Sequence, residues 1–213
     1  IRGKKGTQVK LLIQRGSEQF EVSLERDVVP EDTVKGNVDK DNPTVGSIQI
    51  DNFRETTALE FRTIIEQLRK DGAKSFVIDL RQNSGGLIAE AERVASYFLD
   101  NGDTIAQFSN NKKVISIDKA GKKIDQGFKV KEPTVFLVDQ ESSYGAELVA
   151  AAVKNKNYPI IGVNTFGKGS VQTLSPIGKD NFVQLTIMKW FAPDGSSVEG
   201  KGVSPTIEAD YPE

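Results

Sequence analysis

The sequence predicts an α/β fold in which a mostly parallel sheet is flanked by helices. From Gly46 onward, short apolar stretches typical of buried strands alternate with longer stretches of helical periodicity. The chain has 213 residues, of which 37% are hydrophobic, so it can bury the core of one medium-sized domain. Neither a repeat of fixed period nor a low-complexity segment interrupts the pattern.

The first residues of the chain have a different character. Residues 9–14 and 20–24 are apolar and β-prone, and a polar turn separates them, so we expect a β-hairpin. The next segment is rich in Asp, Pro, Gly and Asn and lacks periodicity. Because two strands alone are marginally stable, we interpret residues 1–29 as the remnant of a small β domain. A linker over 30–45 then leads to a core over 46–213.

The core contains three predicted helices and the strands between them. We expect helices over residues 58–71, 87–99 and 145–155. We expect strands over residues 46–53, 75–81, 133–139, 159–163 and 182–191, β-rich stretches over 104–117 and a hairpin near 119–130. In the first helix Thr57 is the expected cap and Gly72 the stop signal. The apolar face of this helix is expected to contain Leu59, Ile64, Ile65 and Leu68.

The composition excludes several kinds of active site. The chain contains no histidine and no cysteine, which excludes a Ser-His-Asp triad, a cysteine nucleophile, a site built on His or Cys metal ligands, and a disulfide. An enzyme of this composition must use a Lys, a carboxylate or a metal-bound water as its base. The net charge of -2 gives no electrostatic argument for binding nucleic acid or an acidic membrane surface. No apolar run reaches the length of about 18 residues that would cross a membrane.

A glycine-rich segment over residues 162–169 differs by one residue from a phosphate-binding loop. The segment reads GVNTFGKG, and Gly169 stands where a Ser or Thr would ligate Mg²⁺. Such a loop also requires a helix after it, whereas SVQTLSP is typical of a strand and a turn. We therefore do not expect a nucleotide-binding site here.

The same segment contains a candidate general base, Lys168. Its neighbours Gly167 and Gly169 allow the side chain to lie close to the backbone and away from water, and desolvation would favour the neutral amine. Residues i and i+4 of an extended segment point to the same face, so Gln172 is expected to hold the amine through its amide oxygen. The alternative is an ordinary exposed lysine in a glycine-rich loop.

Two strand-to-helix junctions offer the other parts of a possible active site. In DLRQNSGG, Gly85 and Gly86 can turn backbone N–H groups toward a cavity at a helix N-terminus, where an oxyanion is stabilised. The alternative is an ordinary turn that needs glycines for its geometry. In QESSYGAEL, Ser142 and Ser143 lie where a strand–turn–helix elbow would present a nucleophile. The alternative for these serines is helix capping.

Three segments together resemble the carboxyl-terminal processing proteases, a family of serine peptidases with a Ser-Lys dyad. The segments are DLRQNSGGL, TFGKGSVQ and WFAPDGSSVEGKGVSPTIE. In the last segment, the residues that fall on the family's tail pattern are Pro193, Gly195, Gly200, Gly202 and Pro205. The resemblance covers about residues 46–210, and IRGKKGTQVKLLIQRG resembles the last strands of the PDZ domain that precedes the family's catalytic core. It implies a crotonase-like core of strand-strand-helix units behind a truncated PDZ domain.

The sequence departs from the family at the nucleophile. The family segment reads roughly T-A-S-A-S-E-I, and alignment of its Glu on Glu147 places Tyr144 in the nucleophile position. Gly145 then matches the residue whose N–H group helps to form the oxyanion hole, together with Gly85 or Gly86. A slip of one residue would instead make Ser143 the nucleophile. We prefer Tyr144, because the Glu and the apolar helix positions agree with this alignment.

The resemblance implies a serine endopeptidase that cuts protein substrates near apolar C-terminal tails, outside the cytoplasm and without a cofactor or metal. Lys168 would be its general base and Gln172 would orient Lys168. With Tyr144 in place of the nucleophile we expect an inactive chain, and homo-oligomers are possible. Two alternatives remain: a pseudo-peptidase that binds peptide tails without cutting them, and a crotonase-like acyl-CoA enzyme. The Lys168–Gln172 pair and the tail pattern argue against the second alternative, and no basic cluster offers itself to CoA phosphates.

Overall fold

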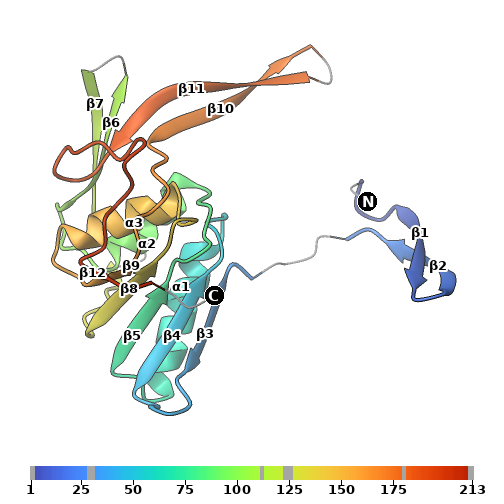
Figure 1. The fold of residues 1–213 in the computed structure, drawn as a ribbon, viewed down its shortest axis with the longest axis horizontal. Coiled ribbons are helices and arrows are strands. Elements are labelled where there is room, and N and C mark those ends of the chain that lie inside the picture. The colour runs from blue at the N-terminus through green and yellow to red at the C-terminus, as the bar shows by residue number, and fades with distance from the viewer. Residues whose placement is uncertain (1–2, 28–31, 111–112, 122–126, 179–180, 211–213) are drawn as a thin grey trace. The chain divides into compact units, whose positions relative to one another are not determined.

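The computed structural model describes residues 3–27, 32–110, 113–121, 127–178 and 181–210 (Figure 1). The chain divides into two compact units, residues 1–32 and residues 33–213. The first unit contains the expected hairpin. Its strands are β1 (Gln8–Arg15) and β2 (Glu18–Glu25), which pair antiparallel.

The second unit is built on a six-stranded sheet of order β12-β9-β8-β5-β4-β3. Its strands are β3 (Val34–Val38), β4 (Val45–Ile50), β5 (Ser75–Asp79), β8 (Thr134–Val138), β9 (Ile160–Gly162) and β12 (Ile207–Glu208). All neighbours pair parallel except β3 and β4, which are antiparallel. The expectation of a mostly parallel sheet is therefore confirmed.

Strand β3 corrects the prediction of a linker over residues 30–45. It lies inside that range and forms an edge of the sheet beside β4. The sequence signal is weak because three of its five residues are exposed and the strand is short. Gly36 has a structural role here, since a Cβ atom at this position would lie 2.4 Å from Cγ2 of Ile64 on the first helix. The glycine therefore allows that helix to pack closely against the edge of the sheet.

Three helices connect the parallel strands. They are α1 (Thr57–Lys70), α2 (Ile88–Ser96) and α3 (Gly145–Lys154), close to the predicted bounds. In α1 the residues Ala58, Phe61, Ile65 and Leu68 are buried, whereas Leu59 is 58% exposed. Leu59 was expected on the apolar face, but it lies about 100° around the helix from Ala58 and so points away from the core. Thr57 is the first helical residue, and the N-cap is Thr56.

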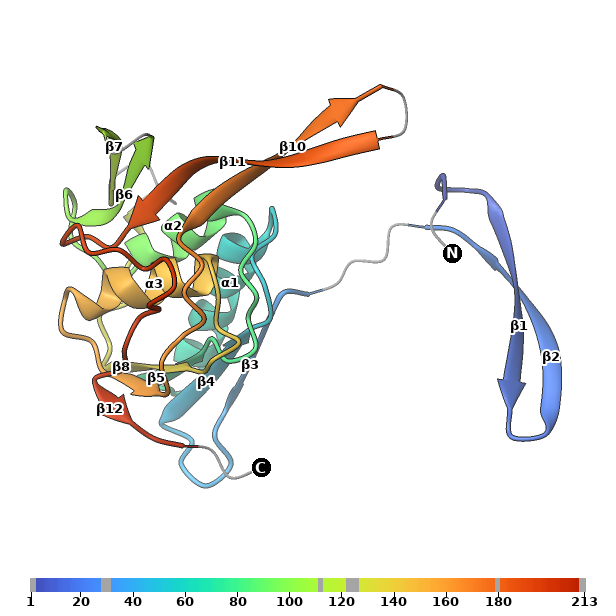
Figure 2. The ribbon, with the colours of Figure 1, turned by 45° about the horizontal axis from the view of Figure 1, so that its top comes forward.

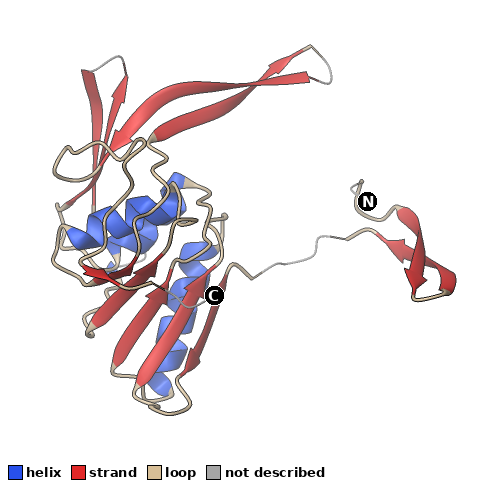
Figure 3. Cartoon of the chain, in the orientation of Figure 1, coloured by secondary structure: helices blue, strands red, loops and turns tan. Residues whose placement is uncertain are grey.

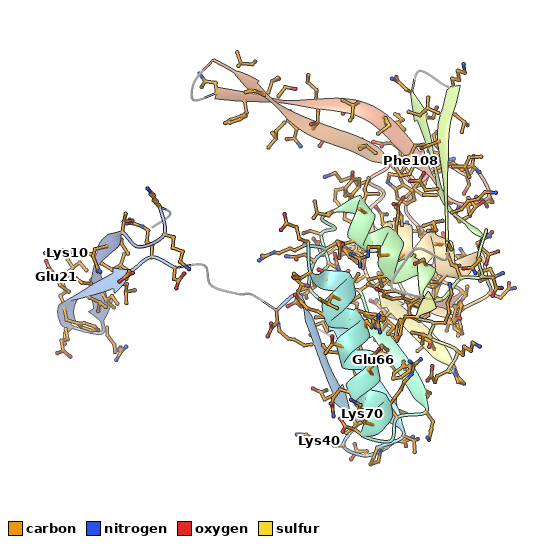
Figure 4. All side chains as sticks on the ribbon, turned by 180° about the vertical axis from the view of Figure 1, so that it is seen from behind. Lys10, Glu21, Lys40, Glu66, Lys70 and Phe108 are labelled. Atoms are coloured by element: carbon orange, nitrogen blue, oxygen red, sulfur yellow. The ribbon has the colours of Figure 1, made fainter. Side chains whose placement is uncertain are left out.

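A second sheet lies on the other side of the helices (Figure 2). It has the order β10-β11-β6-β7, with β6 (Thr104–Asn110), β7 (Lys113–Lys119), β10 (Ser170–Ile177) and β11 (Asn181–Phe191), all antiparallel. Trp190 pairs with Phe108 and both side chains are buried. Their burial fixes this sheet to the helical layer, at the place where Figure 4 labels Phe108. The far part of the β10–β11 hairpin projects beyond the helices (Figure 3).

The hairpin expected near residues 119–130 is not found in the described part of that range. Strand β7 ends at Lys119, residues 120–121 and 127–130 are not in strands, and residues 122–126 lie outside the described residues. No helix among the described residues is long and apolar enough to cross a membrane. The described residues contain no group of three or more His, Cys, Asp or Glu side chains that could hold a metal ion.

Candidate active site

The connection between β8 and α3 is a tightly hydrogen-bonded elbow. The Ser142 hydroxyl donates to the carbonyl of Leu80 at 2.8 Å and accepts from the backbone N–H of Asp139 at 2.9 Å. The N–H of Ser143 donates to the carbonyl of Asn83 at 2.9 Å. Ser142 is fully buried, and its hydroxyl also lies 3.1 Å from Oδ1 of Asp139; these bonds hold the turn together, so Ser142 has a structural role here.

Tyr144 occupies the tip of the elbow. Its backbone has φ 50° and ψ -100°, a conformation that a residue with a Cβ atom adopts only at a cost of about 1–3 kcal/mol. Strained residues at strand-to-helix turns are typical of positions that present a nucleophile. Burial raises the pKa of the Tyr144 phenol to about 12. At neutral pH the phenol is therefore protonated.

Lys168 faces Tyr144. Its Nζ atom lies over the tyrosine ring, 5.2 Å from the ring centroid, a position in which a cationic amine is attracted by the ring face. The side chain is half-buried. The structure thus brings together two residues that are 24 positions apart in the sequence, as the Tyr144 alignment predicts, and we find no contact that pairs Lys168 with Ser143 in the described residues.

Glu147 holds the elbow and the lysine loop in one arrangement. This carboxylate is fully buried. One oxygen accepts from the N–H groups of Tyr144 at 2.9 Å and Lys168 at 2.8 Å. The other oxygen accepts from the N–H of Gly167 and the hydroxyl of Thr165, both at 2.6 Å. The distance between the two site residues is therefore set through a single buried side chain.

The tail segment completes the support of the lysine loop. The indole N–H of Trp190 donates to the carbonyl of Lys168 at 2.8 Å. The N–H of Gly200 donates to the carbonyl of Gly167 at 2.8 Å, and the N–H of Val203 donates to the hydroxyl of Thr165 at 2.7 Å. The segment over residues 190–208 thus contributes to the site by fixing the backbone of residues 165–168.

Gly85 and Gly145 lie beside Tyr144. The three glycines predicted for the oxyanion hole differ in whether their N–H groups already have a hydrogen-bond partner. A Cβ atom on Gly85, which has φ 102°, would lie 2.7 Å from Cβ of Tyr144 and 3.0 Å from the nitrogen of Gly145. The N–H of Gly85 itself donates to the side-chain oxygen of Asn83 at 2.8 Å. Within the described residues, the N–H groups of Gly86 and Gly145 have no hydrogen-bond partner. These two groups are therefore the candidates to stabilise an oxyanion.

Gln172 does not contact Lys168, contrary to the prediction. Its amide oxygen accepts from Nε2 of Gln184 at 2.6 Å, and its amide nitrogen donates to the Thr186 hydroxyl at 3.3 Å. Within the described residues no hydrogen bond joins it to Lys168. The parity argument is wrong because Lys168 lies outside the strand: β10 begins at Ser170, so Lys168 and Gln172 do not belong to one regular extended segment.

The glycine-rich segment over residues 162–169 is followed by strand β10 and not by a helix. A phosphate-binding loop needs the N-terminus of a helix at this point. The prediction that a strand and not a helix follows this segment is therefore confirmed.

The family of the chain follows from comparison with known proteins. The sequence model of peptidase family S41 matches residues 44–209, and the chain therefore belongs to this family of peptidases. The chain is 41% identical over its full length to the carboxy-terminal processing protease CtpA of Bacillus subtilis strain 168, of which it covers 45%. It is 35% identical to a probable CtpA-like serine protease of Staphylococcus aureus strain COL, of which it covers 42%. The resemblance to carboxyl-terminal processing proteases is thus confirmed.

Solved structures agree with this assignment. The photosystem II D1 C-terminal processing protease superimposes with a TM-score of 0.73 and 25% identity, over 98% of this chain and 57% of that one. A lipoprotein from Streptococcus agalactiae shares the fold, with a TM-score of 0.63 and 18% identity over 83% of this chain and 65% of that one. The chain spans less than half the length of the curated relatives named above.

Two residues important to the site geometry were not predicted as site residues. Thr165 was not singled out, and Glu147 was used only to align the sequence. A signal was present for Glu147, because a carboxylate three residues after the elbow begins the otherwise apolar helix α3. For Thr165 the sequence contains no comparable signal, since its partners Glu147 and Val203 lie in distant segments.

Proposed function

We propose that this chain carries the core of a serine endopeptidase that cuts protein substrates near their C-termini, and that Tyr144 in the nucleophile position makes it inactive as it stands. The observation that carries the proposal is the strained backbone of Tyr144 at the tip of the elbow, with the Lys168 amine 5.2 Å from the centre of its ring. Membership of peptidase family S41 supports the reaction class.

In the competent form a serine at position 144 attacks the scissile carbonyl. The neutral amine of Lys168 accepts the hydroxyl proton and later delivers it to the leaving amine. The N–H groups of Gly86 and Gly145 stabilise the oxyanion of the tetrahedral intermediate. For Gln172 to orient the lysine, its amide must exchange the partners Gln184 and Thr186 for Lys168.

Tyrosine at this position opposes the nucleophilic attack and the proton transfer to Lys168. A phenol whose pKa is about 12 has to be deprotonated against the cost of burying its charge. Its ring occupies the space in front of Lys168, whose Nζ atom lies 5.2 Å from the ring centroid.

The test is to replace the tyrosine. Tyr144→Ser is expected to create cleavage of an unfolded protein with an apolar C-terminal tail, measured by the release of new amino termini. Adding Lys168→Ala is expected to abolish this cleavage, because the chain contains no histidine to act as the base. Cleavage by the unaltered chain that is lost on Ser143→Ala would contradict the proposal and make Ser143 the nucleophile.

The second candidate function is a pseudo-peptidase that binds peptide tails without cutting them. The observation in its favour is Tyr144 itself, which leaves the glycines and the lysine of the site in place. Saturable binding of an apolar-tailed peptide by both the unaltered chain and Tyr144→Ser, with no cleavage by either, would support this function. It would also contradict the endopeptidase.

Further properties follow from the same proposal. Residues 1–29 belong to a PDZ domain, the second unit is a crotonase-like core, and the substrates have apolar tails. The protein acts outside the cytoplasm, which is supported by the likeness to a solved structure described as a lipoprotein. It needs no cofactor, and a homo-oligomer is possible. Fractionation of cells that produce the full-length protein tests the location, and analytical ultracentrifugation tests the oligomeric state.

A further inference from the structure

Strand β10 is an edge of the four-stranded sheet and begins two residues after Lys168. It pairs with β11 on one side, and within the described residues no strand pairs with its other side. An edge strand presents a row of unpaired N–H and C=O groups that can accept another extended chain. The position next to Lys168 makes this edge relevant to the site.

The hydrogen bonds identify which backbone groups of β10 face outward. The N–H of Trp190 donates to the carbonyl of Gly169 at 2.8 Å, while Ser170 lies opposite Lys189. In an antiparallel ladder this pattern marks Ser170 and Lys189 as a pair whose own N–H and C=O groups point away from each other. The outward-facing groups of the edge therefore begin at Ser170.

Pro176 identifies the outward-facing residues farther along the strand. A proline cannot donate to a ladder, so in an edge strand it lies where its nitrogen faces away from the partner. Leu174 is two residues earlier in a regular part of the ladder and has the same orientation. The N–H of Leu174 therefore faces the open edge, and Pro176 ends the row of outward donors.

The hairpin also exposes apolar side chains on both faces. Leu174 and Phe182 lie on one face and are 66% and 65% exposed. Leu185 on β11 lies opposite Thr173, points to the other face and is also exposed. An extended chain added to β10 would place alternate side chains against these two faces.

From this placement we infer that the open edge of β10, from Ser170 to Leu174, binds an extended, apolar segment of a protein substrate as an added β-strand. The inference rests on the proposed function and specifies how its substrate is held. A substrate strand in this position runs alongside β10, which follows directly after Lys168. Backbone hydrogen bonds to β10 therefore bring a carbonyl of the substrate to the lysine, whatever side chains the substrate has. Recognition is therefore by extended conformation and apolar character.

The test uses the chain as it exists, with Tyr144, so that binding is measured without turnover. The probe is a ten-residue peptide of alternating valine and threonine, acetylated at its N-terminus and amidated at its C-terminus to remove any free carboxylate. Binding is followed by two-dimensional NMR of the labelled chain. We expect slowed amide exchange at Ser170, Gln172 and Leu174. The same peptide with alternate backbone nitrogens methylated is expected to bind at least tenfold more weakly.

A matched pair of variants tests the edge from the protein side. Leu174→Pro removes one outward N–H and is expected to weaken the peptide at least tenfold. Leu174→Val retains the N–H and is expected to bind within about threefold of the unaltered chain. Fluorescence of Trp190 reports whether the sheet is still folded in each variant. If Leu174→Pro unfolds the sheet, the comparison of the methylated with the unmethylated peptide still tests the inference.

Three results would overturn the inference. The first is equal binding of the methylated and unmethylated peptides. The second is protection of amides elsewhere and not on β10. The third is a dimer without peptide that Leu174→Pro abolishes, which would identify the occupant as a second copy of the chain. Edge-dependent binding together with an inactive Tyr144→Ser would contradict the proposed function and leave the inference intact. Cleavage by Tyr144→Ser with a KM that Leu174→Pro leaves unchanged would support the proposed function and contradict the inference.

Discussion

At the scale of single residues, the site depends on one buried carboxylate more than on the residues that would react. Glu147 accepts four hydrogen bonds. Two of these come from the backbone of Tyr144 and Lys168, so it sets their separation. A carboxylate can accept four bonds because both of its oxygens are acceptors, whereas an amide has a single acceptor oxygen.

Glu147→Gln therefore tests the support of the site. The amide nitrogen would face N–H donors, and the loss of two bonds in a fully buried place is expected to cost about 2–4 kcal/mol of the free energy of unfolding. Urea denaturation followed by Trp190 fluorescence measures this loss. Glu141→Gln, at an exposed carboxylate of the same connection, is the control and is expected to change stability by less than about 0.5 kcal/mol. Equal stability of the two variants would contradict the role given to Glu147.

At the scale of secondary structure elements, the contact of α2 with β7 contains a carboxyl pair. Burial and the neighbouring Asp118 raise the pKa of Glu92 to about 8, from an ordinary value of 4.5. One oxygen of Glu92 is buried without a hydrogen-bond partner in the described residues. The pair is therefore favourable while Glu92 is protonated and unfavourable when both groups are charged.

This pair gives the chain a pH-dependent stability of predictable sign. Because the pKa of Glu92 is higher in the folded than in the unfolded chain, its stabilisation is fully present below about pH 4.5 and is lost as the pH rises through about 8. We expect the unaltered chain to lose at least about 1 kcal/mol between pH 5 and pH 9 that Glu92→Gln does not lose. Chemical denaturation at several pH values measures the difference. Glu55→Gln, at an exposed carboxylate, should follow the unaltered chain, and parallel curves for all three would refute the assignment.

At the scale of the whole molecule, the chain consists of a hairpin unit and a much larger unit that contains the entire site. The boundary lies at Asp32–Thr33. Thr33 belongs to the larger unit, since its hydroxyl and N–H both donate to the carboxylate of Glu60 on α1. The six-stranded sheet, the four-stranded sheet, the three helices and the residues around Tyr144 all lie after this boundary in the sequence and so belong to the larger unit.

Removal of residues 1–32 is therefore expected to leave the larger unit folded. Trp190 is the single tryptophan of the chain and is buried in the larger unit, so its fluorescence reports on that unit alone. We expect the midpoint of its thermal unfolding to fall by no more than a few degrees, and the affinity for an apolar-tailed peptide to stay nearly unchanged. A tenfold loss of affinity, about 1.4 kcal/mol, would show that the hairpin is a working part of a binding site.

The sequence by itself determined the elements with strong periodicity and the local motifs. The three helices, the parallel strands β4, β5, β8 and β9, and the hairpin of the first unit were predicted close to their bounds, because each has an apolar pattern that depends on neighbouring residues alone. The family and the pairing of positions 144 and 168 were also predicted, because the glycines and the lysine stand in segments whose order and spacing are distinctive.

The tertiary structure decided what depends on contacts between distant segments. Strand β3 could not be predicted because its exposed, polar residues are stabilised by pairing with β4 and by the approach of α1 at Gly36. The partners of Gln172 were decided by the pairing of β10 with β11, which places Thr186 opposite Gln172 and which no local pattern encodes. Glu147 became the centre of the site because folding brings residues 165–168 to the N-terminus of α3, where a buried carboxylate must find its hydrogen bonds.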